Sequence, residues 1–240
     1  MDYHGSFEGY MDSKFKFFTL CENPVVNIEN QLVLEYLKEQ DLNVVVYGDY
    51  FNYVEDSVLF MDELIIDLNS SNLVGEDMQK NFLGAMLMSN VLELDFDLSK
   101  KVAFDFVYLP HRQEVIKISG KTFVNDSASV TPDSTISALQ AFKDTDVLIL
   151  GGLDRGYDFS QLFKSIIASS VELVCVLPDL ELDSYKDAEV KILKFDSIDD
   201  CLNYLKSTNY KNILFSPGAP SYNQFQNFYE RGDKFKSLLK

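Results

Sequence analysis

Three turns in the second half of the chain carry the residues best suited to chemistry. Ser216-Pro217-Gly218 follows an apolar run over 213–215 and leads into a segment with apolar residues at helical spacing. Where a strand ends at a helix N-terminus, unpaired backbone N–H groups point outward and favour anions. The sequence therefore predicts an anion-binding turn here, followed by a helix over 221–239 that Ser221 caps.

Charged side chains accompany the other two turns. Arg112 offers a planar fork suited to phosphate or carboxylate. Asp126 follows an apolar run directly, where a carboxylate can accept hydrogen bonds from a ribose. Gly151 and Gly152 allow a sharp turn before Arg155. On these residues alone a structural interpretation stays open, with Asp126 as a helix cap, Arg112 in a surface ion pair and the glycines ending a strand.

The elements that position these turns alternate in type along the second half. Apolar spacing predicts helices over 135–143, 159–168 and 198–206. Short apolar runs predict strands over 147–150, 171–177, 190–195 and 212–215. Two alternating segments flank Ser119-Gly120 and predict a hairpin over 114–125. Such alternation indicates a mostly parallel, doubly wound sheet, with ligands at the carboxyl ends of its strands. We therefore expect the three turns to open on one edge.

The first half shows a weaker pattern. Strands are predicted over 43–47, 57–61 and 64–67, and a buried helix over 78–92. These elements are too few to enclose their own apolar surface, so this half is expected to be part of a domain. The pattern changes at Leu109-Pro110. The expected architecture is α/β, with part of a domain at 1–109 and a complete Rossmann-like domain with a mostly parallel sheet at 110–240.

Composition narrows the classes of partner. A net charge of −17 disfavours nucleic acid and anionic membrane surfaces. No run of about 18 apolar residues is present to span a membrane, and the N-terminus lacks a signal-peptide pattern. The three cysteines are widely spaced, which favours a reducing, cytoplasmic location and argues against a disulfide framework or a Cys-based metal site. With only two histidines, a His-based metal site is also not expected.

Gly120-Lys121-Thr122 looks like the end of a phosphate-binding loop. The full motif requires a glycine five residues before Gly120, where the chain has Val115, and a helix after the Thr, where an alternating segment is predicted. We therefore interpret this tripeptide as a hairpin turn.

Several motifs resemble the Mur ligases of the MurD type, which add D-glutamate to UDP-N-acetylmuramoyl-L-alanine. The C-terminal signature of that family is matched at Ser216, Pro217, Ala219, Ser221, Gln224, Phe225, Phe228, Arg231 and Gly232. Leu109-Pro110-His111-Arg112, Asn125-Asp126-Ser127 and Gly151-Gly152-Leu153-Asp154 resemble three further blocks of the family. The resemblance extends over residues 2–239.

The resemblance implies ATP-dependent amide formation through an acyl phosphate, in the peptidoglycan synthesis that underlies cell shape and cell division. ATP, Mg, D-glutamate and UDP-N-acetylmuramoyl-L-alanine are the implied cofactors and substrates. Lys14 corresponds to a lysine that is carbamylated in the family and helps hold magnesium, which implies a catalytic and metal-binding role. The implied ATP contacts are Asn81, Arg112 and Asp126. The implied D-glutamate contacts are Arg155, Ser221, Tyr222 and Phe228.

The chain also departs from the family pattern. Asp77 and Met78 replace a His and an Asn close to Asn81. Ala128 and Val130 replace a Lys and a Thr beside the substrate site, and Arg155 stands where the family has Lys. The substrate site is therefore expected to be recognisable but divergent.

The resemblance begins partway through the central ATPase domain of the family. The phosphate-binding loop, the magnesium-binding Glu and the N-terminal UDP-binding domain have no match in the 240 residues. Because phosphoryl transfer depends on positioning and charge stabilisation, we expect little ligase activity from this chain alone. The alternatives are a fragment, a truncated reading frame, one piece of a split enzyme with an N-terminal partner chain, and a non-catalytic binding module. A sister ligase of the meso-diaminopimelate or folylpolyglutamate type ranks last.

Overall fold

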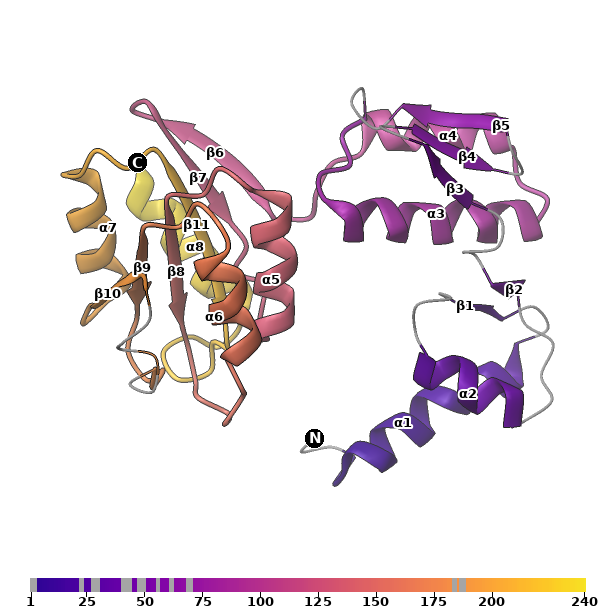
Figure 1. Ribbon diagram of the computed structural model, residues 1–240, viewed down its shortest axis with the longest axis horizontal. Helices are drawn as coiled ribbons and strands as arrows, with labels where there is room; N and C mark the ends of the chain where they lie inside the picture. The colour runs from indigo at the N-terminus through magenta and orange to yellow at the C-terminus, as the bar shows by residue number, and fades with distance from the viewer. Residues whose placement is uncertain are drawn as a thin grey trace. The chain divides into compact units, whose positions relative to one another are not determined.

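The structure is a computed structural model and describes residues 4–21, 24–26, 31–39, 45–46, 51–54, 57–60, 63–67, 71–182, 185 and 189–240. The chain divides into two compact units, Met1–Phe106 and Val107–Lys240 (Figure 1). The outer residues of the strand expected over 43–47, and the last residue of the strand expected over 57–61, lie outside the described residues.

The second unit contains a six-stranded sheet with the order β10-β9-β8-β11-β7-β6. Its strands are β6 (Glu114–Ile118), β7 (Lys121–Asn125), β8 (Val147–Gly151), β9 (Leu173–Val176), β10 (Lys191–Lys194) and β11 (Asn212–Gly218). Only the β6–β7 pair of this sheet is antiparallel, and the other neighbours run parallel. The mostly parallel α/β sheet predicted from the sequence is confirmed.

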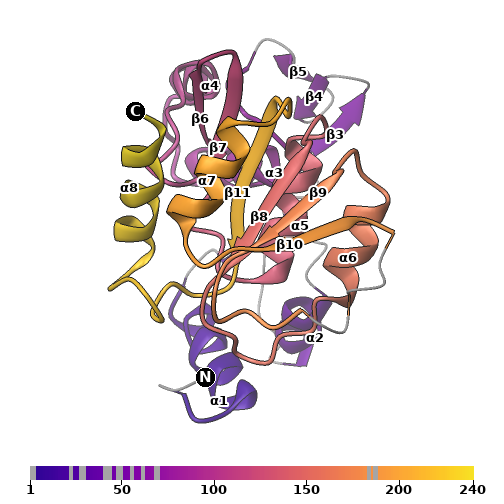
Figure 2. The same ribbon diagram turned by 90° about the vertical axis from the view of Figure 1, so that its left-hand side faces the viewer.

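Four helices cover the two faces of this sheet. They are α5 (Pro132–Ala141), α6 (Ser160–Ile167), α7 (Ile198–Lys206) and α8 (Phe228–Leu239). Helices α5 and α6 pack on one face, and α7 and α8 on the other (Figure 2). Because side chains alternate along a strand, Leu148 and Leu150 enter the first core while Val147 and Ile149 enter the second. All four are fully buried, and each contributes about 1.5–3 kcal/mol relative to exposure.

Strand β11 lies between β7 and β8, although it comes last in the sequence. The connections after β7 and β8 lead to α5 and α6 on one face of the sheet, whereas the connection after β11 leads to α8 on the other face. The sheet therefore has a topological switch point beside β11. Ligands of open α/β sheets bind outside the carboxyl ends of strands at such a point. Two of the turns singled out from the sequence follow β7 and β8, which are the neighbours of β11. Ser216-Pro217-Gly218, expected as a turn after a strand over 212–215, instead forms the end of β11, and the loop begins at Ala219.

The β6–β7 hairpin places Gly120-Lys121-Thr122 at a turn and strand start, as predicted. Ser119 and Gly120 both have positive φ, 51° and 75°, as the favoured two-residue turns require. The Lys121 ammonium donates to the carbonyls of Thr208 and Tyr210, both at 2.6 Å. This lysine therefore ties the hairpin to the loop between α7 and β11.

The last helix begins later than the sequence suggested. Residue 227, not Ser221, is the cap: Asn227 has an extended backbone, and its side chain accepts the N–H of Glu230 at 2.9 Å. The carbonyl of Ser221 accepts the N–H groups of Gln224 and Phe225, which closes one separate turn. The expected continuous helix over 221–239 was wrong, because asparagine is a preferred cap and its extended backbone interrupts the helix.

The first unit consists of short elements and two longer helices. They are α1 (Phe7–Phe15), η1 (Phe18–Leu20), β1 (Val25–Val26), α2 (Gln31–Glu39), β2 (Val45–Val46), β3 (Phe51–Val54), β4 (Ser57–Phe60), β5 (Glu63–Asp67), α3 (Glu76–Val91) and α4 (Phe96–Asp105). Strands β3, β4 and β5 form an antiparallel meander, while β1 and β2 pair in parallel. The core of α3 and α4 includes Leu83, Met86 and Ala103.

Several elements of this unit escaped the sequence analysis, namely α1, α2, β1, β3 and α4. Helix α4 had a local signal, because Asp95 caps it by accepting the N–H of Leu98 at 2.9 Å. Among the helices that the structure describes, none is long and apolar enough to cross a membrane.

Candidate functional site

Three loops meet at the carboxyl edge of the second unit's sheet. We call them the β7–α5 loop (126–131), the β8–α6 loop (152–159) and the β11–α8 loop (219–227). The N–H of Asp126 donates to the carbonyl of Phe215 at 2.8 Å, and the N–H of Leu153 donates to the carbonyl of Pro220 at 2.7 Å. The three turns therefore share one edge, as the alternation of strands and helices predicted.

A buried arginine connects all three strand ends. The side chain of Arg231 in α8 is only 2% exposed. Its Nε and Nη2 donate to the hydroxyl and carbonyl oxygens of Ser127 at 3.1 and 2.8 Å. Its Nη1 donates to the carbonyls of Ala219 at 2.9 Å and Gly151 at 3.2 Å. Burial lowers the pKa of Arg231 to about 10, so the group stays charged at neutral pH, and the four hydrogen bonds offset its desolvation.

The second glycine of the β8–α6 turn makes room for this arginine. Gly152 has a φ of 137°, which only glycine adopts readily. A Cβ at this position would lie 2.3 Å from the carbonyl oxygen of Pro220 and 3.0 Å from Nη1 of Arg231. The Gly-Gly turn is therefore needed for the close approach of two loops and a guanidinium.

The carboxylate of Asp126 is buried at the start of the β7–α5 loop, with 3% of the residue exposed. Its Oδ1 accepts the N–H of Gln113 at 3.2 Å, and its Oδ2 accepts the hydroxyls of Ser129 at 2.5 Å and Ser216 at 2.8 Å. Burial raises the pKa of Asp126 to about 6, although these hydrogen bonds and the charge of Arg112 lower it. Three protein donors thus already use this carboxylate, and a ribose hydroxyl would have to share its remaining acceptor capacity.

The buried side chain of His111 holds the segment that precedes β6 in place. The Nδ1 of His111 lies 2.9 Å from the amide nitrogen of Asn125, which must donate, so the ring proton is on Nε2. That nitrogen lies 3.4 Å from a carboxylate oxygen of Asp233. Burial lowers the pKa of His111, which favours the neutral ring. The ring packs on Gly232, where a Cβ would lie 2.2 Å from Nδ1.

Arg112 is the exposed neighbour of this histidine. Its N–H donates to the carbonyl of Leu109 at 3.1 Å, and the carbonyl of His111 accepts the N–H of Ala128 at 2.9 Å. The guanidinium is close enough to Asp126 to lower the pKa of that carboxyl. The structure thus brings these two predicted nucleotide contacts together at one edge.

The four predicted D-glutamate contacts lie on or next to the other two loops. Arg155 is exposed on the β8–α6 loop. Ser221 is buried on the β11–α8 loop, and Tyr222 beside it is 65% exposed. Phe228 is half-buried, and its carbonyl accepts the hydroxyl of Ser127 at 2.8 Å. The bond between residues 153 and 220 joins the two loops that carry Arg155 and Ser221.

Lys14 belongs to the first unit. It is exposed on α1, and its ammonium lies 5.6 Å from the centroid of the Tyr10 ring. Among the residues that the structure describes, no group of three or more His, Cys, Asp and Glu side chains is placed to hold a metal. The metal role of Lys14 stays a prediction.

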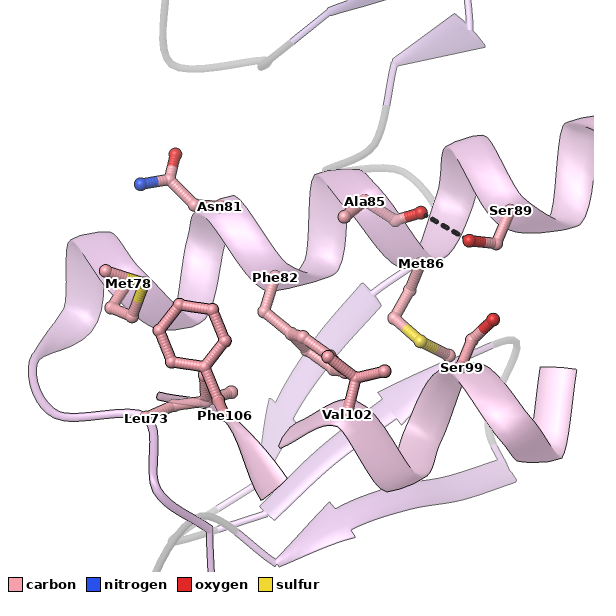
Figure 3. A pocket seen from close by; sticks show the side chains of 10 residues that line it. All are labelled: Leu73, Met78, Asn81, Phe82, Ala85, Met86, Ser89, Ser99, Val102 and Phe106. Atoms are coloured by element: carbon pink, nitrogen blue, oxygen red, sulfur yellow. Dashed lines mark hydrogen bonds between the residues drawn. The ribbon is translucent and has the colours of Figure 1, made fainter. Parts of the chain in front are cut away.

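Asn81 also belongs to the first unit and stands at an apolar groove between α3 and α4 (Figure 3). The groove has a volume of about 290 Å³ and is lined by Leu73, Met78, Asn81, Phe82, Ala85, Met86, Ser89, Ser99, Val102 and Phe106. The amide of Asn81 points away from the apolar side chains (Figure 3). A base in this groove would reach that amide only after a rotation of the side chain.

The sequence analysis placed Ser216 in an anion-binding turn and matched Arg231 only to a family signature, and it did not single out Ser129; the structure places all three side chains in hydrogen bonds at the carboxyl edge. A signal for Arg231 was present, because it lies three residues after Phe228 and four before Phe235. That spacing puts all three on one helix face, and a charge within an apolar face indicates a buried, hydrogen-bonded group. Ser129 gave no such signal.

Comparisons with curated proteins identify relatives along the whole chain, although no protein-family model matches it. The UDP-N-acetylmuramoylalanine--D-glutamate ligase of Aquifex aeolicus is 31% identical over 249 residues, covering 100% of this chain and 59% of the relative. The ligase of the same name from Oenococcus oeni is 33% identical over 205 residues, covering 78% of this chain and 44% of the relative. The chain thus spans less than two thirds of the length of these relatives.

Solved structures share the fold at lower identity. The MurF ligase from Thermotoga maritima, in complex with ADP, matches with a TM-score of 0.69 and 16% identity, covering 99% of this chain and 58% of that one. A folylpolyglutamate synthase from Thermotoga maritima matches with a TM-score of 0.55 and 14% identity, covering 87% of this chain and 51% of that one. The resemblance found in the motifs is confirmed: the chain is a homologue of the UDP-N-acetylmuramoylalanine--D-glutamate ligases and has the fold of the Mur ligases.

Proposed function

We propose that this chain forms the amino-acid-binding part of an ATP-dependent amide ligase that joins D-glutamate to UDP-N-acetylmuramoyl-L-alanine. The observation that carries the proposal is the pair of exposed arginines at the carboxyl edge of the second unit. Arg155 lies on the β8–α6 loop, and the segment that carries Arg112 is hydrogen-bonded to the β7–α5 loop. The sequence relationship to D-glutamate ligases supports this substrate. The chain covers 59% of the Aquifex aeolicus relative, and we propose that it contributes one part of the complete ligase activity.

Each unit then has its own part in the reaction. Residues 1–109 correspond to part of the central ATPase domain, and residues 110–240 to the C-terminal Rossmann-like domain. In this scheme Asn81, Arg112 and Asp126 hold ATP, and Lys14 supports a magnesium ion that would neutralise phosphate charge. Ligands of this kind imply a cytoplasmic location.

The chemistry is the attack of an amine on an activated carboxyl group. The muramoyl-alanine carboxylate takes the terminal phosphoryl group of ATP and forms an acyl phosphate and ADP. The amine of D-glutamate attacks the acyl carbon, a C–N bond forms, phosphate leaves, and the amine releases a proton. Arg155 pairs with a glutamate carboxylate, since guanidinium and carboxylate match as planar, doubly hydrogen-bonding groups. Ser221, Tyr222 and Phe228 orient the rest of the amino acid.

A second candidate is a binding module without phosphoryl transfer. Residues 1–106 contain twenty Asp and Glu residues against six Lys and Arg residues. Two of these cations, Lys80 and Lys100, already pair with Glu76 and Asp97 of their own helices. Such an acidic unit is a poor host for a triphosphate unless a partner chain adds cations. This observation favours either a module that keeps only the amino-acid pocket or a split ligase.

Calorimetry and a product assay separate these proposals. We expect the purified chain to bind D-glutamate more tightly than L-glutamate, and to form no amide from ATP and both substrates without a partner chain. Amide formation by the chain alone would show a complete ligase. Equal affinity for both enantiomers, or no binding of either, would overturn the proposed substrate.

A further inference from the structure

We propose that Arg231 is a positioning residue that couples the three loops of the carboxyl edge, so that a change in one loop is transmitted to the others. The identity of the ligands that use this coupling rests on the proposed function. The coupling itself is a property of the protein and can be measured without any ligand.

The contacts of Arg231 reach parts of the chain that are far apart in sequence. Ser127 is the second residue of the β7–α5 loop, Gly151 ends β8 just before the β8–α6 loop, and Ala219 begins the β11–α8 loop. Other connections at this edge join fewer loops: the N–H of Gly218 donates to the carbonyl of Ser129 at 3.2 Å, and the Asp126 carboxylate accepts from Gln113 and Ser216 but makes no described bond to the β8–α6 loop. One rigid group therefore bonds to two of the loops and to the strand end from which the third begins, which makes the three loops a single mechanical unit.

The chemistry of the guanidinium explains why this position holds an arginine. Its donors diverge in a fixed plane, so Nη1 reaches two carbonyls on one side while Nε and Nη2 reach Ser127 on the other. A lysine has the same charge, but its donors share one nitrogen and cannot span this distance. Arg231→Lys therefore tests bridging geometry separately from charge.

The coupling predicts an effect at a distance. The N–H of Leu153 bonds to Pro220 and has no contact with the β7–α5 loop among the hydrogen bonds described for it. Removing the Ser127 hydroxyl takes away the bond to Nε of Arg231 and also the bond to the carbonyl of Phe228. If Arg231 transmits the change, Leu153 in the other loop becomes less protected.

Amide hydrogen exchange resolved by residue tests this inference. We expect the Leu153 amide to exchange about tenfold faster in Arg231→Lys, the loss that follows when hydrogen bonds to a charged group are broken. We expect a smaller acceleration, about threefold, in Ser127→Ala. Ser134→Ala is the matched control, because its hydroxyl serves only the α5 cap among the bonds described for it, and Leu153 should stay at the wild-type rate.

Amides of β9 report global unfolding and provide the reference. A variant in which Leu153 and the β9 amides accelerate together has lost only overall stability, and that result would overturn the coupling. If Arg231→Lys does not fold, Ser127→Ala decides alone, and an unchanged Leu153 rate there would equally overturn it. Calorimetry on the same variants tests the proposed function separately: absence of D-glutamate binding in the wild type would refute the substrate and leave the exchange result standing.

Discussion

The imidazole of His111 packs against the backbone of Gly232, so closely that a Cβ at Gly232 would lie 2.2 Å from Nδ1 and 2.5 Å from Cγ of the ring. Gly232 lies within helix α8, where alanine is normally the more stable residue. The contact reverses that preference, because the ring is buried and held by Asn125 and Asp233.

We therefore expect Gly232→Ala to lower the free energy of unfolding by about 2–3 kcal/mol, as overpacking in a core does. Gly120→Ala is the matched control. Gly120 has a positive φ of 75° but open space around its missing Cβ, so only about 1 kcal/mol of backbone strain is expected. Chemical denaturation of both variants measures the difference. A Gly232→Ala variant as stable as the wild type would show that the ring does not lie there.

The buried Asp126 carboxyl predicts a dependence of stability on pH. Its pKa rises from 3.8 to about 6 on folding, so the folded state binds this proton more tightly than the unfolded chain. The free energy of unfolding should fall as pH rises through this window, by at most about 3 kcal/mol, and level off above it. Asp126→Asn should remove this component from the denaturation profile. Identical pH profiles for the two proteins would contradict the burial.

Ser129 offers a finer test of the same carboxyl. Its hydroxyl donates to Oδ2 of Asp126 at 2.5 Å and so stabilises the charged form. Ser129→Ala should raise the pKa of Asp126 further, which carbon-detected NMR of the carboxyl would measure. A lower pKa in the variant would show that the hydroxyl does not donate to this carboxylate.

The D-glutamate proposal predicts a strong effect at Arg155. Loss of a hydrogen-bonded guanidinium should weaken D-glutamate binding by about tenfold to a hundredfold in Arg155→Ala. Arg155→Lys restores the residue type of the family and should retain most of the affinity. Calorimetry measures both variants, and unchanged binding in the alanine variant would remove this residue from the site.

The true helix cap predicts where the last helix can be weakened. Asn227→Ala should lower the free energy of unfolding by about 1 kcal/mol, because the N–H of Glu230 loses its acceptor. Asn227→Asp keeps an acceptor and is expected to stay near the wild type. Denaturation midpoints measure both, and equal losses in the two variants would argue against a capping role.

The sequence was most informative where periodicity and packing agree. The strands β8 and β9 are short apolar runs between helices, so their type and parallel pairing followed from the pattern. The hairpin at Ser119-Gly120 followed from its turn chemistry. The shared edge of the three loops also followed, because parallel strands must end at the same side of the sheet.

Other features depend on contacts that no local pattern encodes. The break before α8 arises from the extended backbone of Asn227, in a segment whose apolar spacing continued through it. The roles of Arg231 and Asp126 as buried anchors depend on carbonyls and hydroxyls from other loops. In the first unit, short elements such as β1 have too few residues for a period to appear.

An NMR titration of the purified chain with D-glutamate, followed at each backbone amide, tests most directly whether the carboxyl edge of the second unit binds the amino acid. We predict saturable shifts that gather on the β8–α6 and β11–α8 loops, with the amides near Arg155 and Ser221 moving most. Shifts confined to other parts of the chain, or no shifts at saturating D-glutamate, would contradict the assignment of this edge as the amino-acid site.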